Sequence, residues 1–217
     1  MSGAEEGQYA SNSRAIYIDI DDVLSQTSRL LNDILYKHHN RRVDYESLTD
    51  FDLGVSYGLE PHEVDHFLGL AHTPEAIEAL SVVDGAVPAL EHWSASGYKV
   101  QLLTGRPPHT EAATRSWLGR HTVPHQSLAF VDKYGRAASG PEGDSVLTLD
   151  NVASMDFCLA VEDSLEVAAF LAERLEIEVA LMDQPWNRDV SHLASHVRAR
   201  LVRCHGWVEV MQRFPTP

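Results

Sequence analysis

Four short groups of polar residues stand out in this chain, because each one follows directly on an apolar run. The groups combine acids with a hydroxyl, an arginine and a lysine, and they are spread from residue 19 to residue 163. In chain order they are Asp19-Ile20-Asp21-Asp22, Thr104-Gly105-Arg106, Asp132-Lys133 and Glu162-Asp163. If the apolar runs are neighbouring parallel strands, these side chains meet in one small volume at the carboxyl ends of the strands.

The acids in these groups indicate a divalent cation. Asp19, Asp21 and Asp163 offer hard oxygen ligands. Three carboxylates so close together repel one another unless one is protonated or a cation lies among them. Mg²⁺ fits best, because it prefers carboxylates and water and leaves positions open for a phosphate oxygen.

The remaining side chains suit a phosphate ester. The hydroxyl of Thr104 and the ammonium group of Lys133 both donate to phosphate oxygens. A free carboxylate beside them can attack phosphorus to form an aspartyl phosphate, which water then hydrolyses. A second carboxyl two residues further on can protonate the leaving oxygen and afterwards activate that water. These residue types therefore predict phosphoryl transfer.

The runs before the polar groups have the composition of buried strands. Short apolar runs rich in β-branched and aromatic residues, bounded by turn residues, predict strands. Strands that are apolar on both faces belong in a parallel sheet covered by helices. The predicted strands are residues 15–18, 100–103, 128–131, 157–161 and 178–182.

Helical spacing fills the segments between these strands. It predicts helices over residues 86–96, 109–118 and 165–175, the first of them ended by Gly97. A closing helix is predicted from Val190 to Met211, where apolar residues step by three or four. The predicted fold class is therefore α/β, a doubly wound parallel sheet of the Rossmann-like kind.

A small helical cap is predicted directly after the first strand. Residues 25–82 contain short helical patterns but no strong strand. We expect this segment to cover the edge of the sheet, with residues 14–24 and 83–213 forming the α/β core domain. Residues 1–13 are polar and are predicted to be a loose tail, and residues 135–144, rich in Gly, Pro and Ser, a loop.

Composition narrows the class of partner. The chain has 217 residues and a formal net charge of −15, which argues against binding a nucleic acid polymer. No stretch approaches the roughly 18 apolar residues of a membrane span, so no membrane partner is expected. With only two cysteines, Cys158 and Cys204, a disulfide framework is excluded and a cytoplasmic location is favoured. The expected partner is a small phosphorylated metabolite, and a homodimer is left open.

The four polar groups, taken in order, resemble the haloacid dehalogenase (HAD) superfamily of phosphatases. Asp19-Ile20-Asp21-Asp22-Val23-Leu24 resembles its first motif and Leu103-Thr104-Gly105-Arg106-Pro107 its second. Lys133 resembles the third motif and Val161-Glu162-Asp163-Ser164 the fourth. The resemblance implies a Mg²⁺-dependent phosphoric monoester hydrolase.

The same resemblance implies a role for each motif residue. Asp19 would be the nucleophile and a metal ligand, and Asp21 the general acid/base whose backbone carbonyl also binds the metal. Asp163 would be the third protein ligand of Mg²⁺, with Glu162 as an outer partner or an alternative ligand. The phosphate would be held by Thr104, Gly105, Lys133 and Arg106.

Within the superfamily, the chain most resembles the 5′(3′)-deoxyribonucleotidase-like branch of the cytosolic type. The shared features are the helical insertion after the first motif, Val131-Asp132-Lys133 at the end of a strand, and Met182–Asn187 after the fifth strand. A 5′-nucleotidase acting on (deoxy)nucleoside monophosphates is the implied activity. One departure is Asp22, where the family usually has Gly, which tolerates a positive φ more readily.

Several alternatives stay open from sequence. Arg106 can contact phosphate or can pair with a carboxylate, with equal weight, and Trp186 and Asn187 can close a loop or line the rim of the site. For function, two alternatives to a nucleotidase are a protein that keeps the fold and recognises a ligand without catalysis, and a phosphatase or phosphomutase that acts on a non-nucleotide phosphate. A dehalogenase is disfavoured, because it needs neither a metal nor the acids Asp21 and Asp163.

Overall fold

The computed structural model describes residues 14–135 and 146–217. The predicted tail, residues 1–13, and most of the predicted loop at 135–144 lie outside this range. Within it, seven strands form one sheet in the order β4-β3-β2-β1-β5-β6-β7, and every pairing is parallel. The strands are β1 (Ala15–Ile18), β2 (Lys99–Thr104), β3 (Ser127–Asp132), β4 (Leu147–Thr148), β5 (Leu159–Glu162), β6 (Glu178–Met182) and β7 (Leu201–Cys204).

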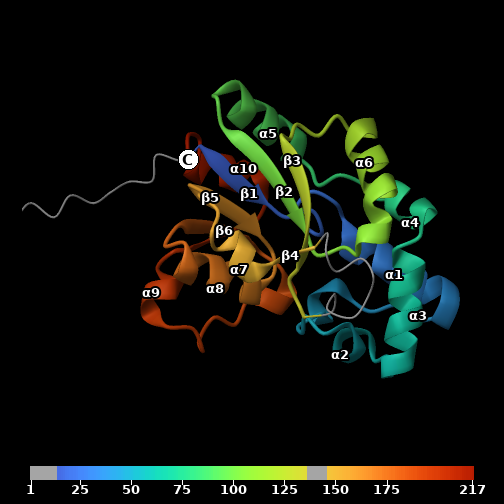
Figure 1. Ribbon diagram of the computed structural model, residues 1–217. Coiled ribbons are helices and arrows are strands. Elements are labelled where there is room, and N and C mark those ends of the chain that lie inside the picture. The colour runs from blue at the N-terminus through green and yellow to red at the C-terminus, as the bar shows by residue number, and fades with distance from the viewer. Residues whose placement is uncertain (1–13, 136–145) are drawn as a thin grey trace, which may run out of the picture.

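Helices cover both faces of this sheet, so the predicted doubly wound α/β fold is confirmed (Figure 1). Alternate strand residues face opposite layers: Ile16 and Ile18 of β1 belong to one apolar cluster and Tyr17 to the other. The first layer is made by α5 (Ala86–Ala95), α6 (Glu111–Arg120) and α10 (Trp207–Arg213). The second is made by α7 (Leu149–Val152), α8 (Leu165–Arg174) and α9 (Ser195–Arg198).

The segment between β1 and β2 is helical, and its helices gather beside one end of the sheet (Figure 1). A third apolar cluster, which includes Leu35, Tyr57 and Phe67, holds them together. The last of these helices packs against α6, and its Ile77 belongs to the core of the sheet. The helices are α1 (Thr27–His39), the short 3₁₀ helix η1 (Tyr45–Ser47), α2 (Leu53–Tyr57), α3 (Pro61–Ala71) and α4 (Pro74–Glu78).

The closing helix predicted from Val190 to Met211 is wrong. This stretch instead holds α9, the edge strand β7 and α10. Its apolar residues lie on opposite faces of the sheet, Val197 in one layer and Val210 in the other, so their three- and four-residue spacing does not form one helical stripe. As an edge strand, β7 is only partly buried and lacks the apolar run by which the inner strands are recognised.

Two connections contain short 3₁₀ helices. A 3₁₀ helix, η2 (Pro108–Thr110), precedes α6, and another, η4 (Pro185–Asn187), follows β6. In the part of the chain that the structure describes, no helix combines the length and the apolar character that crossing a bilayer requires.

Candidate active site

The carboxyl ends of the central strands bring the predicted acids together. Asp19 follows β1, and its backbone N–H donates to the carbonyl of Val161 in β5, at 3.0 Å. Asp19 therefore lies beside the end of β5, which carries Glu162 and Asp163. These three residues each offer a carboxylate oxygen, and the three oxygens lie within 4.8 Å of one another.

Lys133, which follows β3, lies among these acids. Its Nζ is 2.8 Å from Oδ1 of Asp19 and 2.8 Å from Oε2 of Glu162, and its side chain is 1% exposed. Burial lowers the pKa of the lysine, but the charges of the two acids outweigh burial and hold the pKa well above its usual value. Lys133 is therefore a fixed cation. We call Asp19, Lys133, Glu162 and Asp163 the lysine cluster.

Glu162 is fully engaged within this cluster. One oxygen accepts from the hydroxyl of Tyr17 at 2.9 Å and from Lys133 at 2.8 Å. The other oxygen accepts from the backbone N–H groups of Asp163 and Ser164, at 3.2 and 3.1 Å. Because both oxygens are occupied, the geometry favours Glu162 as the partner of Lys133 and an outer neighbour of a metal rather than as a direct ligand.

Asp19 is buried beside the ammonium group of Lys133. Its Oδ1 forms the 2.8 Å ion pair with Lys133 and has no other polar partner among the described residues. Burial and the charge of Glu162 raise the pKa of Asp19 to about 8, against the opposing effect of Lys133. Burial, Glu162 and Asp19 likewise raise the pKa of Asp163 well above its usual value.

This donor set fits a divalent cation. When ionised, three carboxylates against one ammonium group leave two negative charges in a buried site, which a doubly charged ion balances. Hard carboxylate oxygens are the ligands that Mg²⁺ takes in proteins. The residues present therefore suit Mg²⁺ between Asp19 and Asp163.

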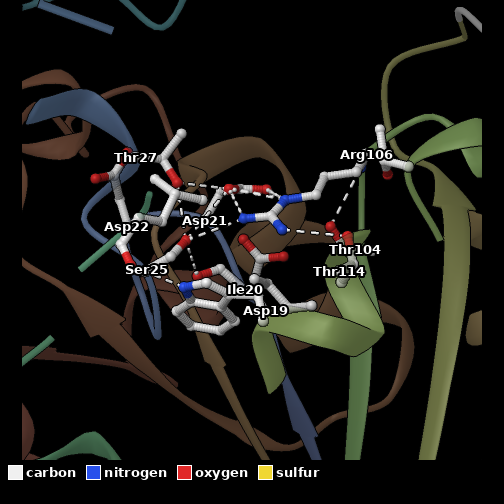
Figure 2. A network of polar contacts seen from close by, with 12 residues as sticks. Asp19, Ile20, Asp21, Asp22, Ser25, Thr27, Thr104, Arg106 and Thr114 are labelled. Carbon is white, nitrogen blue, oxygen red and sulfur yellow. Dashed lines mark hydrogen bonds and ion pairs between the residues drawn. The ribbon is translucent and has the colours of Figure 1, made fainter. Parts of the chain in front are cut away.

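Asp21 points into a different group of residues, shown in Figure 2. Nε of Arg106 donates to both of its oxygens, at 3.0 and 3.2 Å, and Nη2 donates to Oδ1 at 2.7 Å. The hydroxyl of Thr27 donates to the same Oδ1 at 2.5 Å. Burial alone would raise the pKa of Asp21, but the charge and hydrogen bonds of Arg106 outweigh it and lower the pKa to about 2.

The guanidinium of Arg106 is buried, and each of its three nitrogens donates a hydrogen bond. Besides Asp21 it donates to the hydroxyls of Thr114 and Ser25, at 3.3 and 3.2 Å. Of the two alternatives for this residue, the structure favours pairing with a carboxylate, although that carboxylate lies 85 positions away in the chain. We call Asp21, Arg106, Ser25, Thr27 and Thr114 the arginine cluster.

Thr104 and Gly105 shape the turn between the two clusters. The hydroxyl of Thr104 accepts the backbone N–H of Arg106 at 3.2 Å and is completely buried. A side chain at Gly105 would place its Cβ 3.2 Å from the ring of Tyr134 and 3.4 Å from Cδ of Lys133. Glycine at this position therefore leaves room for the lysine to reach the acids.

Asp22 adopts the positive φ, 52°, that the family's glycine would allow. Its carboxylate accepts from the backbone N–H and the hydroxyl of Ser28, at 3.0 and 2.5 Å, in the first turn of α1. Burial raises the pKa of Asp22 to about 7 in spite of these bonds. In this turn the Asp22 side chain therefore anchors the start of α1.

A cavity of about 670 Å³ opens between the helical segment and the ends of the strands. Three residues of the lysine cluster and three of the arginine cluster line it, and its walls also carry aromatic and aliphatic side chains together with acids. Lining residues include Asp19, Asp21, Lys133, Asp163, Phe51, Tyr57, Tyr134, Trp186, Leu31, Leu68, Asp50 and Asp65.

Sequence reasoning did not assign Tyr17 to the site. Its apolar strand neighbours gave it the appearance of a core residue, and it is fully buried, but its hydroxyl is bonded to Glu162. A buried tyrosine usually finds a hydrogen-bond partner, which is the signal that could have linked it to an acid on a neighbouring strand.

Residues 62–178 match the protein family described as PITM 1-3, LNS2 domain. The matched segment covers more than half of the chain, including the lysine cluster apart from Asp19. The chain belongs to this family. The human membrane-associated phosphatidylinositol transfer protein 1 is 40% identical to this chain over 48 residues. These residues make up 22% of this chain and 4% of that protein. This chain therefore corresponds to only a small part of such relatives.

Another relative of this LNS2-family chain is similar over nearly its whole length. It is a protein of Halalkalibacterium halodurans named as a putative nucleotidase, 24% identical over 88% of each chain.

Several solved structures have the same fold as this chain. A predicted phosphatase from Clostridium acetobutylicum superposes with a TM-score of 0.62 at 12% identity, over 94% of this chain and 98% of the other. A phosphonoacetaldehyde hydrolase like protein from Oleispira antarctica gives 0.61 at 12% identity, over 100% and 95%. A HAD-superfamily hydrolase from Ehrlichia chaffeensis gives 0.50 at 12% identity, over 94% and 97%. The predicted HAD fold is confirmed.

Proposed function

We propose that this protein is a Mg²⁺-dependent phosphomonoester hydrolase that works through an aspartyl phosphate on Asp19. The observation that carries the proposal is the buried carboxylate of Asp19, which lines the cavity beside Lys133 and Asp163. A nucleophilic carboxylate must lie next to a group that attracts the phosphate, and Lys133 is such a group.

The metal would be held by the carboxylates of Asp19 and Asp163 and by the backbone carbonyl of Asp21. When bound, Mg²⁺ supplies positive charge for the phosphate oxygens and keeps Asp19 ionised. Lys133 contributes a second positive charge from within the protein, and Glu162 and the hydroxyl of Tyr17 keep it in place.

In the first step, a carboxylate oxygen of Asp19 forms a bond to phosphorus as the bond from phosphorus to the leaving oxygen breaks. The leaving oxygen takes a proton from Asp21. In the second step, water attacks the aspartyl phosphate, Asp21 accepts the proton of that water, and Asp19 is regenerated with release of inorganic phosphate.

Arg106 makes Asp21 better suited to the second step than to the first. With its pKa lowered to about 2, Asp21 is ionised at neutral pH and ready to act as a base. To deliver a proton to the leaving group, Asp21 must first separate from the guanidinium and take up a proton from water; the proton that it accepts from the attacking water in the second step restores it for a following turnover. Since Asp21 and Arg106 both line the cavity, an entering substrate can compete with Asp21 for the guanidinium of Arg106.

The substrate that we propose is a (deoxy)nucleoside monophosphate. Aromatic residues of the cavity wall, among them Phe51, Tyr57 and Tyr134, offer surfaces on which a base can stack. The similar bacterial protein named as a nucleotidase also supports this class. The acids Asp50 and Asp65 on the same wall disfavour a leaving group that carries further negative charge.

A panel of phosphomonoesters tests the proposal. It includes deoxy- and ribonucleoside 5′- and 3′-monophosphates, sugar phosphates and a generic aryl phosphate, each with Mg²⁺ and with a chelator. We expect Mg²⁺-dependent phosphate release, fastest with nucleoside monophosphates. Hydrolysis of sugar phosphates alone would leave the reaction intact and overturn the nucleotide assignment.

The arginine cluster favours a second candidate, a protein that binds phosphate esters without turning them over. An acid/base residue held by a buried guanidinium suits retention of a ligand as well as catalysis. Absence of turnover across the panel, together with Mg²⁺-dependent binding of a phosphomonoester, would favour this candidate. Under either function we propose that the ligand is a small phosphorylated metabolite and that the protein acts in the cytoplasm. We propose no nucleic acid or membrane partner. Sedimentation tests whether the protein forms a homodimer.

A further inference from the structure

Trp186 differs from the other three tryptophans of the chain in what its indole N–H contacts. Trp93, Trp117 and Trp207 are at most 1% exposed, and each donates to a backbone carbonyl at 2.8–2.9 Å. The N–H of Trp186 instead donates to Oδ2 of Asp163, at 3.1 Å. One tryptophan is therefore bonded to a side chain of the lysine cluster, and the others fasten the core.

Trp186 also lies where the helical segment meets the sheet. It belongs to η4 after β6, and its ring meets the ring of Tyr45 edge-on, with 6.1 Å between the centroids. Tyr45 belongs to η1, whose Glu46 pairs with Arg188 on the other side of η4. The indole is therefore held from the cap side by Tyr45 and bonded on the core side to Asp163.

The backbone of Asp163 is held from the same short helix. The amide of Asn187 donates to the carbonyls of Asp163 and Met182, at 2.8 and 2.7 Å. Asn187 is completely buried, and Arg203 of β7 donates to its side-chain oxygen at 2.7 Å. With the backbone fixed in this way, the indole bond determines which way the carboxylate turns.

A hydrogen bond to one oxygen of a metal-binding carboxylate orients the other oxygen. Such outer contacts commonly change metal affinity by about 10–100-fold. Trp can only donate, so its N–H keeps Oδ2 of Asp163 turned toward η4 and leaves Oδ1 for a cation. No other bond to this carboxylate is recorded among the described residues, which makes Trp186 its principal anchor.

We propose that Trp186 is a positioning residue that presents Asp163 to Mg²⁺ and links the metal site to the docking of η1 on η4. The inference rests on the Mg²⁺ site of the proposed function. Because binding free energies are reciprocal, weakening the contact of Tyr45 with Trp186 weakens Mg²⁺ binding, and binding of Mg²⁺ strengthens that contact.

Trp186→Phe removes the N–H but keeps an aromatic ring of similar shape. In titration calorimetry with Mg²⁺ alone, we expect its dissociation constant to rise about 10-fold, with saturating Mg²⁺ restoring most of the turnover. The matched control is Trp117→Phe, which removes an indole N–H bonded to a core carbonyl and should leave Mg²⁺ affinity unchanged. Tyr45→Ala should weaken Mg²⁺ binding by about 3-fold and have a smaller effect in the Trp186→Phe background.

A measurement on the unaltered protein covers the case in which Trp186→Phe does not fold. In ¹⁵N-labelled protein, Mg²⁺ should shift one of the four indole N–H signals strongly and leave the three buried in the core in place. Wild-type Mg²⁺ affinity in folded Trp186→Phe, or Mg²⁺ binding that moves no indole signal, would overturn the inference. If the wild type binds no Mg²⁺, the proposed function itself fails, which is a separate result.

Discussion

The two candidate catalytic carboxylates lie two residues apart in the chain but in contrasting surroundings. Asp19 belongs to the lysine cluster, where three acids face one ammonium group. Asp21 belongs to the arginine cluster, where one acid faces one guanidinium and hydroxyl groups complete the hydrogen bonds. Both carboxylates lie at the same edge of the sheet and line the same cavity.

Burial by itself would raise the pKa of both residues, so the difference between their pKa values comes from the charges beside them. The pKa of Asp19 is raised to about 8 and that of Asp21 is lowered to about 2. The lysine cluster holds negative charge that only a cation or a proton relieves, whereas the arginine cluster is balanced without help. Neutralising Asp19 should therefore stabilise the fold, and neutralising Asp21 should destabilise it.

Asp19→Asn should produce the largest effect on turnover. It removes the oxygen that attacks phosphorus, and we expect hydrolysis to fall at least about 1000-fold. In the absence of metal the same change should raise the melting temperature by a few degrees, because it removes a charge that burial disfavours. Turnover and calorimetric melting of the purified protein check both effects.

Asp33→Asn is the control for this substitution, since Asp33 lies exposed on α1 and pairs with the exposed Arg42. It should change neither quantity. Wild-type turnover in Asp19→Asn would refute the nucleophile, and a lowered melting temperature would refute the excess of negative charge in the lysine cluster.

Asp21→Asn should have the next largest effect, with the opposite sign for stability. It leaves the buried guanidinium of Arg106 without its counter-charge, a situation that commonly costs about 3–5 kcal/mol. We expect the melting temperature to fall by roughly 10 °C and turnover to fall by about 100-fold or more, through loss of the acid/base group.

Replacing both partners, Asp21→Asn with Arg106→Met, separates the two causes. The double variant should regain part of the lost melting temperature, because no unpaired charge is buried, but none of the turnover. A single variant as stable as the wild type would contradict the role of the ion pair.

The sequence allowed the lysine cluster to be predicted better than the arginine cluster. Each residue of the lysine cluster follows an apolar strand, and the carboxyl ends of parallel strands meet at one edge, so residue order alone indicates that Asp19, Lys133 and Asp163 converge. The partner of Arg106 was not predictable in this way. A guanidinium binds phosphate and carboxylate equally well, and only the folded turn shows that Asp21 lies within reach.

For the fold as well, the sequence allowed some elements to be predicted and not others. The inner strands β1, β2, β3, β5 and β6 are mostly apolar, with polar residues mainly at their ends, and residues of each were predicted as strands. The edge strand β7 is only four residues long, includes the charged Arg203 and follows the short helix α9. Apolar residues from two layers therefore gave the spacing of one long helix. The two-residue strand β4 carries too little pattern to predict.

Mg²⁺ should stabilise the protein in a way that depends on pH. The raised pKa of Asp19 means that, between about pH 4 and pH 8, the metal-free folded protein binds more protons than the unfolded chain. The contribution of Asp19 to the stability of the metal-free protein therefore falls as the pH rises through this window. Mg²⁺ takes the place of the proton, so the increase in melting temperature on adding Mg²⁺ should be larger at pH 8 than at pH 6.

At a Mg²⁺ concentration of about 100 times the dissociation constant, the increase at pH 8 should be roughly 5–10 °C. Calorimetry with Mg²⁺ and with a chelator, at pH 6, 7 and 8, measures it. Asp19→Asn should reduce both the increase and its dependence on pH. An increase that is the same at all three pH values would contradict the raised pKa of Asp19.

The smallest expected effect is at Asp22, which follows Asp21 in the chain and lines the same cavity. Asp22→Ala loses the bonds to Ser28 and keeps the positive φ of 52°, which costs an alanine about 1–2 kcal/mol. Asp22→Gly loses the same bonds but relieves the backbone. We expect alanine to lower the melting temperature by roughly 4 °C more than glycine does. Equal melting temperatures for the two variants would show that the turn carries no strain, and that the side-chain bonds alone explain why this chain tolerates Asp at the position.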